Sequence, residues 1–127
     1  MKILAIRGKN LASLADEFEI DFTKEPLLSS GIFAITGDTG AGKSTILDAL
    51  CVALFNNAPR FNSGSTDVRI DDITGRSPKN IMRRDASECY AEVDYIGNDG
   101  RKYMSRWSLS RGLRKGKVQT AKMFLRS

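Results

Sequence analysis

No run of apolar residues in the 127-residue sequence reaches the roughly 18 residues that a membrane-spanning helix requires. The first ten residues also lack the uninterrupted apolar segment of a signal peptide, because charges lie among the apolar positions. Cysteine is scarce: Cys51 and Cys89 lie far apart, and we expect two free thiols in a reducing compartment rather than a disulfide. These absences predict a cytoplasmic domain without a membrane partner.

Acidic residues are missing from the sequence after Asp99. The net charge is +5, and residues 101–126 carry nine basic side chains and no acidic one. Charge of one sign over such a length favours contact with a polyanion, and a solvated strand face with an exposed turn is the alternative. The candidates for contact with double-stranded DNA are Arg111, Arg114, Lys115 and Lys117.

Length and composition fit one domain over residues 1–127, with 41% hydrophobic and 28% charged residues. Hydrophobic patterns predict a first antiparallel strand pair and a later antiparallel meander of three strands. The predicted strands are residues 2–10, 17–22, 88–95, 101–110 and 118–125. Asn98, Asp99 and Gly100 indicate a hairpin turn, and Trp107 is expected in the core rather than as a platform for stacking bases.

Residues 32–36 are apolar without alternation, which is typical of a central strand buried on both faces. Residues 37–44 then fit the phosphate-binding pattern G-x-x-x-x-G-K-[ST]. An apolar helix is expected from about residue 42 to residue 54, followed by an irregular excursion over residues 60–87 with one short helical piece at 78–83. The predicted fold class is therefore α/β, with a mixed sheet around the phosphate-loop helix and an antiparallel meander.

The glycine-rich turn has the chemistry of phosphate binding. Its glycines permit backbone conformations that point successive amide groups at a phosphate, and the following helix adds the positive end of its dipole. Lys43 is expected to act as the catalytic cation on the β- and γ-phosphates of ATP, and the Ser44 hydroxyl to ligate Mg²⁺. The predicted nucleotide-binding residues of the turn are Gly37, Asp38, Thr39, Gly40, Ala41, Gly42, Lys43, Ser44 and Thr45.

One part of an ATPase is missing after Ser44, namely a second apolar strand that ends in a carboxylate. Such carboxylates support magnesium and polarise the attacking water in phosphate-loop enzymes. The acidic pair Asp71 and Asp72 lies in the irregular region instead. We therefore expect this chain to bind nucleotide without cleaving it alone.

Segments that flank the phosphate loop carry a family resemblance. The segments are residues 9–14 (KNLASL), 18–22 (FEIDF), 33–50 with the phosphate loop, and 82–93 (MRRDASECYAEV). Together they resemble the N-terminal half-head of SbcC, the SMC-like, ABC-type ATPase partner of the SbcD nuclease. The similarity extends from residue 1 to about residue 107.

The resemblance implies the N-terminal lobe of a DNA double-strand-break-repair ATPase that gates an SbcD-type exonuclease and endonuclease. Two heads of such a homodimer enclose ATP between them. The Q-loop, the coiled coil and the C-terminal lobe that the family has are not found in this sequence, so the resemblance implies a fragment whose hydrolysis needs that lobe.

Several residues acquire roles only through this resemblance. Asn10 and Ser13 match a segment near adenine and ribose, and Arg84 matches a position that can approach the nucleotide. A salt bridge with Asp85 or Glu88 is the alternative for Arg84. Ala12 stands where relatives place arginine, and Asp38 where they often place proline or asparagine, so base contacts and affinity are in question at these two positions.

Two other functions fit parts of the sequence. A small stand-alone phosphotransferase on the phosphate-loop fold predicts a lid with arginines and a nearby acceptor site. A nucleic-acid-binding module with a vestigial loop predicts salt-sensitive DNA binding that ignores nucleotide.

Overall fold

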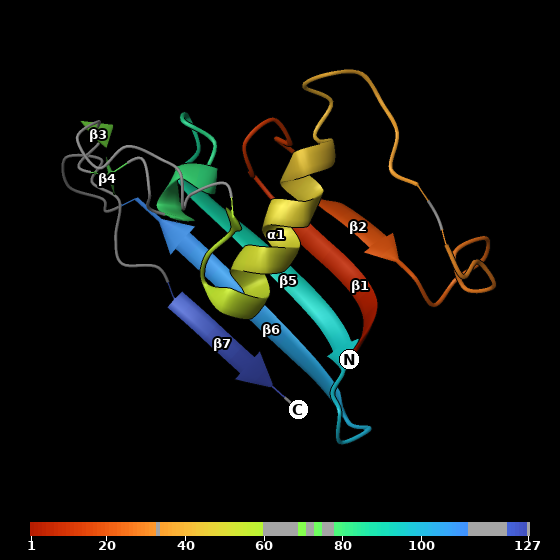
Figure 1. Ribbon diagram of the computed structural model, residues 1–127. Coiled ribbons are helices and arrows are strands. Elements are labelled where there is room, and N and C mark those ends of the chain that lie inside the picture. The colour runs from red at the N-terminus through yellow and green to blue at the C-terminus, as the bar shows by residue number, and fades with distance from the viewer. Residues whose placement is uncertain (33, 60–68, 71–72, 75–77, 112–121, 127) are drawn as a thin grey trace.

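A five-stranded antiparallel sheet with one helix across its face forms the body of the molecule (Figure 1). The computed structural model describes residues 1–32, 34–59, 69–70, 73–74, 78–111 and 122–126. The strand order is β2-β1-β5-β6-β7. The strands are β1 (Lys2–Lys9), β2 (Phe18–Asp21), β5 (Glu88–Ile96), β6 (Lys102–Ser110) and β7 (Lys122–Arg126). The helix is α1 (Lys43–Phe55).

The alternating sequence patterns correctly identify the strands of this sheet. β1 pairs with β2 in antiparallel register, as predicted, and β5, β6 and β7 form the predicted meander. The hairpin between β5 and β6 lies at Asn98–Asp99–Gly100, where Gly100 has a φ of 79° that residues other than glycine rarely adopt. β7 begins at Lys122, and the earlier part of the strand predicted at 118–125 lies outside the described residues.

The core lies between α1 and one face of the sheet. Trp107 is fully buried there, which confirms its predicted role as a core residue. Its indole Nε1 donates a hydrogen bond to Asn56 Oδ1 at 2.7 Å, and the Ser105 hydroxyl donates to the Ala53 carbonyl. Asn56 follows the last turn of α1 with a φ of 56°, so β6 holds the C-terminal end of the helix directly.

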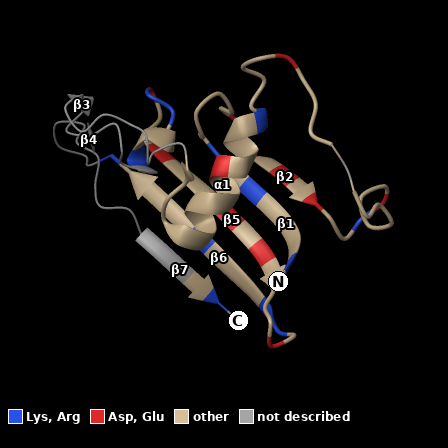
Figure 2. Cartoon of the chain, viewed as in Figure 1, with Lys and Arg blue, Asp and Glu red and all other residues tan. Residues whose placement is uncertain are grey.

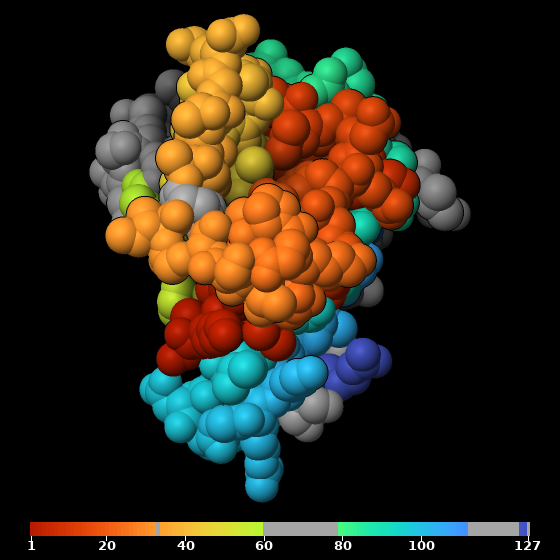
Figure 3. Space-filling model, turned by 90° about the vertical axis from the view of Figure 1, so that its right-hand side faces the viewer, coloured from red at the N-terminus to blue at the C-terminus, as the bar shows by residue number. Residues whose placement is uncertain are grey.

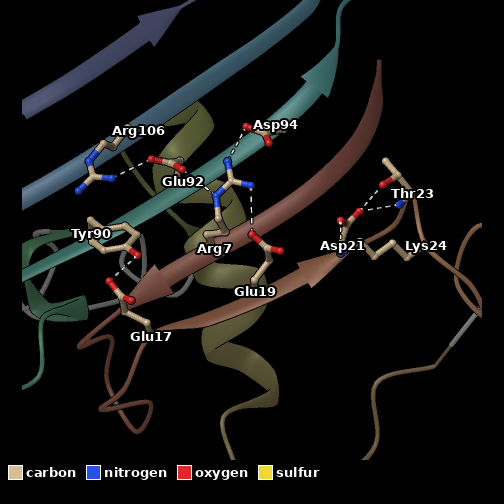
Figure 4. Close-up of polar contacts among 10 residues, drawn as sticks. All are labelled: Arg7, Glu17, Glu19, Asp21, Thr23, Lys24, Tyr90, Glu92, Asp94 and Arg106. Carbon is tan, nitrogen blue, oxygen red and sulfur yellow. Dashed lines mark hydrogen bonds and ion pairs between the residues drawn. The ribbon is translucent and has the colours of Figure 1, made fainter.

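Charged residues occur on neighbouring strands of the sheet (Figure 2). Those that alternate with the buried residues of β5 and β6 lie on the face opposite the core. Arg7 of β1 bonds to Glu92 and Asp94 of β5, each at 2.7 Å, and lies 3.5 Å from Glu19 of β2 (Figure 4). Arg106 of β6 donates to the other oxygen of Glu92 at 2.8 Å. Four strands are therefore joined across this face by charge-assisted hydrogen bonds and ion pairs.

The prediction of a central strand at residues 32–36 is wrong. The described residues of this segment form no strand, Ile32 is 94% exposed and Ile35 is 40% exposed. In Figure 1 the connection from β2 to α1 runs beyond the edge of the sheet, and in Figure 3 it lies on the surface that faces the viewer. A central strand needs a hydrogen-bonded neighbour at each edge, and no described strand of this chain pairs with the segment.

The sheet is consequently antiparallel throughout its described strands, instead of the predicted mixed sheet. The excursion after α1 contains a small hairpin of β3 (Arg69–Ile70) and β4 (Ile73–Thr74). The short helical piece predicted at 78–83 is the 3₁₀ helix η1 (Pro78–Ile81). Both cysteines are free, with Cys89 buried and Cys51 half-buried. No helix among the described residues has the length and apolar character needed to cross a membrane.

Candidate nucleotide-binding site

The glycine-rich turn leads directly into the N-terminus of α1. Gly42 precedes the first helical residue with a φ of 105°, and Gly40 has a φ of 84°. Both values lie in the left-handed region where a side chain is strained, so the two glycines are required by this path of the backbone. No side chain of the described residues caps α1, and the dipole of the helix therefore makes its N-terminus favourable for an anion.

Lys43, Ser44 and Thr45 form the first turn of α1 and differ in exposure. The Lys43 ammonium donates to the Gly37 carbonyl, so the lysine lies back over the turn that precedes it. The Ser44 side chain is exposed, whereas Thr45 is only 4% exposed. A cation and a hydroxyl are thus available at the anion-favouring end of the helix.

A cavity of about 340 Å³ opens at this end of α1. This volume is at the small end of ligand pockets in proteins. The cavity has two walls, one formed by the turn and α1 and the other by the loop after β1. Its lining residues are Ala12, Ser13, Gly40, Gly42, Lys43, Ser44 and Thr45. Ser13 is thus beside the phosphate loop, and its contact with the adenine or ribose of a nucleotide remains a prediction.

Other predicted residues of the turn do not line this cavity. Gly37 and Asp38 contribute their carbonyls, which accept hydrogen bonds from Lys43 and from the amide of Ala41. The Asp38 side chain is exposed. Thr39 and Ala41 lie in the same turn, and their nucleotide contacts remain a prediction.

Asn10 and Arg84 also lie outside the lining of this cavity. Asn10 Nδ2 donates to the Glu88 carbonyl at 2.9 Å, which ties the end of β1 to the start of β5. The Arg84 side chain is exposed, and within the described part of the chain no ion pair joins it to Asp85 or Glu88. The contacts of Asn10 and Arg84 with a nucleotide remain a prediction.

Arg111 is held by backbone carbonyls of the segment that follows η1. Its Nε donates to the Ala86 carbonyl at 3.0 Å and its Nη2 to the Arg84 carbonyl at 2.8 Å. Arg114, Lys115 and Lys117 lie outside the described residues. DNA contact by these four basic residues remains a prediction.

Two residues beside the cavity were not predicted from the sequence. Arg83 Nη1 donates to the Ala12 carbonyl at 3.0 Å, and the Leu14 side chain packs against Gly42. The family resemblance directed attention to the neighbouring Arg84, and no sequence pattern indicated Arg83. The sequence gives no signal that separates Leu14 from Leu11, the other leucine of the same connection.

Among the described residues, no carboxylate lines the cavity at the phosphate loop. The same residues contain no group of three or more cysteine, aspartate and glutamate side chains placed to hold a metal ion. A magnesium ion at this cavity would be held by the Ser44 hydroxyl, by oxygen atoms that the ligand itself supplies and by water.

Comparison with known proteins identifies a family and relatives of this chain. The model of the AAA domain family matches residues 5–125. The SbcC subunit of the SbcCD nuclease of Pseudomonas aeruginosa is 56% identical over 115 residues, which cover 87% of this chain and 10% of the relative. Its counterpart in Rhodobacter capsulatus is 48% identical over 127 residues, which cover 94% of this chain and 10% of the relative. The chain thus spans about a tenth of the length of these relatives.

Proposed function

The chain belongs to the AAA domain family and is related to the SbcC subunits of the SbcCD nuclease, and on this basis we propose that it is the ATP-binding lobe of a DNA-repair ATPase. The observation that carries the proposal is the cavity where Gly40, Gly42 and Lys43 to Thr45 meet at the N-terminus of α1. Backbone amides, a cation and a hydroxyl there match the charge and hydrogen-bonding capacity of a magnesium-bound triphosphate.

In this proposal the residues of the turn and of the first turn of α1 make different contacts with the nucleotide. The amides of the turn and of the first turn of α1 donate to phosphate oxygens, while Lys43 leaves the Gly37 carbonyl and neutralises the terminal phosphates. Ser44 contributes a ligand to Mg²⁺, which supplies charge neutralisation for the phosphates when it is bound. Ser13 lies on the second wall and faces the remainder of the nucleotide.

Hydrolysis needs a carboxylate that the described lining of the cavity does not have. We therefore propose that catalysis requires a second lobe beyond these 127 residues, brought together with this one in a dimer of cytoplasmic ATPase heads. The proposed partners of the whole assembly are an SbcD-type nuclease subunit and double-stranded DNA. Arg111, Arg114, Lys115 and Lys117 stay the candidates for the DNA contact.

The test is calorimetric titration of ATP with magnesium into the chain and into its Lys43→Ala variant. We expect the variant to bind ATP on the order of tenfold more weakly or worse, because a charge-assisted contact to phosphate is lost. Lys102→Ala is the matched control, since Lys102 is an exposed lysine of β6 that does not line the phosphate-loop cavity. Equal binding by the Lys43→Ala variant and the parent would contradict the proposed site.

A second measurement addresses hydrolysis. Phosphate release is measured with the chain alone and after addition of a C-terminal lobe from a related SbcC protein. Turnover is expected only in the mixture, because the chain supplies the phosphate loop and the added lobe supplies the carboxylate. Turnover by the chain alone, abolished in Lys43→Ala, would instead favour a self-contained phosphotransferase or ATPase.

A further inference from the structure

The loop after β1 lies directly against the phosphate loop. Ala12 and Ser13 of this loop line the cavity opposite Gly40 and Gly42. Leu14 packs on the backbone of Gly42, where an added Cβ would lie only 2.5 Å from Leu14 Cδ2. The position of the second wall therefore depends on how this loop is held against α1.

The backbone of the same loop adopts an unfavourable conformation. Asn10 has a φ of 55° and Ala12 a φ of 44°, both in the left-handed region that residues other than glycine rarely adopt. Asparagine tolerates this region, but alanine has no polar side chain that could compensate locally. Such a conformation persists only where surrounding contacts determine it, and it is common at ligand-binding loops.

Contacts with the end of η1 and with the segment after it supply that constraint. Leu11 is fully buried in the core, the amide of Ala12 donates to the Ile81 carbonyl at 2.7 Å, and the amide of Arg83 donates to the Asn10 carbonyl at 2.9 Å. A side-chain contact adds to these backbone bonds, from Arg83 Nη1 to the Ala12 carbonyl at 3.0 Å. Arg83 itself is exposed and does not line the cavity.

We propose that Arg83 is a positioning residue for nucleotide binding, which fixes the Ala12–Ser13 wall opposite the phosphate loop by holding the Ala12 carbonyl. The inference rests on the proposed function. Because the turn at Gly40 and Gly42 and the first turn of α1 bind the phosphates, the Ala12–Ser13 wall contacts the ribose and base. Arg83 therefore affects recognition of the nucleoside and leaves triphosphate binding unchanged.

The test compares ATP with inorganic triphosphate, each titrated with magnesium into the parent chain and its variants. Arg83→Ala is expected to weaken ATP binding on the order of fivefold, the effect of one hydrogen bond, and to leave triphosphate binding within about twofold. Arg83→Lys, which keeps a donor and the charge, is expected to restore part of the ATP affinity. Arg101→Ala, an exposed arginine after the β5–β6 hairpin, removes the same charge and should change neither ligand.

The outcomes separate this proposal from the function on which it rests. If the parent binds ATP and Lys43→Ala does not, while Arg83→Ala binds ATP like the parent, the positioning role is overturned and the nucleotide site stands. Equal losses of ATP and triphosphate affinity in Arg83→Ala also overturn the positioning role. With a lowered melting temperature they indicate general loosening of the fold, and without one they indicate a long-range charge effect. Binding of neither ligand by the parent overturns the nucleotide site itself.

Discussion

At the scale of single residues, Glu92 connects the charges on the outer face of the sheet. Burial raises the pKa of its carboxyl, but the hydrogen bonds from Arg106 and Arg7 outweigh this effect and hold the pKa below its usual value. The hydrogen bond with Asp94 in turn raises the pKa of Arg7, although burial opposes it. The Glu92 carboxylate is therefore more stable in its charged form in the folded chain than in the unfolded chain.

Replacing Glu92 by glutamine is expected to lower the free energy of unfolding by about 1 to 2 kcal/mol at about pH 7, because both arginines lose a charged acceptor. The folded-state pKa is lowered, so the stabilisation is complete above the unfolded pKa of about 4.3 and disappears as the pH falls through the folded value. Urea unfolding of parent and variant at a series of pH values from about 7 to about 3 measures this difference.

Glu19→Gln is the matched control for this prediction. Glu19 is 3.5 Å from Arg7 and its side chain is half exposed, so its loss should cost less than that of Glu92. A difference between parent and Glu92→Gln that stayed constant down to about pH 3 would show that charge is not the source of the stabilisation.

At the scale of elements, α1 is fixed at both ends by different parts of the chain. Leu14 and the phosphate loop meet its N-terminal end, and Ser105 and Trp107 of β6 bond to Ala53 and Asn56 at its C-terminal end. The helix carries the phosphate-binding residues in its first turn, so contacts made about three turns away help to orient the cavity.

Trp107→Phe is expected to lower the free energy of unfolding by about 2 to 3 kcal/mol. The change leaves a smaller ring in a fully buried position and removes the donor to Asn56 Oδ1. Denaturant unfolding of this variant, of Asn56→Gly and of the double variant forms a thermodynamic cycle. Glycine at position 56 keeps the φ of 56° accessible while removing the acceptor.

The two changes are expected to be less than additive by about 0.5 to 1.5 kcal/mol, because each removes the same hydrogen bond. Strict additivity would mean that the bond contributes nothing to stability and that the cost of Trp107→Phe comes from packing alone.

At the scale of the whole molecule, the face beside the β2–α1 connection remains apolar and open. A groove of about 790 Å³ lies between β1, β2, α1 and this connection. Leu28 is 56% exposed and Leu47 is 55% exposed along its lining. Apolar surface of this kind attracts hydrophobic molecules from water.

We expect the chain to bind a hydrophobic fluorescent dye and to associate increasingly as its concentration is raised. Leu47→Glu should reduce the dye signal and the association, measured by fluorescence titration and sedimentation velocity. Phe55→Glu is the control, because Phe55 is 71% exposed but does not line the groove. Equal reductions by the two variants would show that the groove has no special part in either property.

Local patterns in the sequence account for much of the fold and for one of the two walls of the cavity, the wall formed by the phosphate loop. The buried residues Ala91 and Val93 alternate with polar or charged residues, and so do Trp107 and Leu109. This alternation predicts strands with one buried face, because successive side chains point to opposite faces. The spacing of Gly37, Gly42 and Lys43 predicts a phosphate loop, because that geometry is formed within a few consecutive residues.

Contacts between distant segments could not be predicted in the same way. Arg83 and Arg84 are adjacent and chemically identical, and only the pairing of the loop after β1 with the segment after η1 directs Arg83 to Ala12. Residues 32–36 have the composition of a central strand, but a strand also requires partners at its edges. Composition is a property of the segment, whereas partners are a property of the assembled chain.

The periodic strands, the apolar helix and the phosphate-binding turn follow from the sequence, because each depends on residues that are close along the chain. Folding in three dimensions was needed to bring Leu14 and Arg83 to the second wall of the cavity, to tie two strands together through Asn10, and to leave residues 32–36 outside the sheet. These outcomes depend on hydrogen bonds and packing between segments many residues apart, which no local pattern encodes.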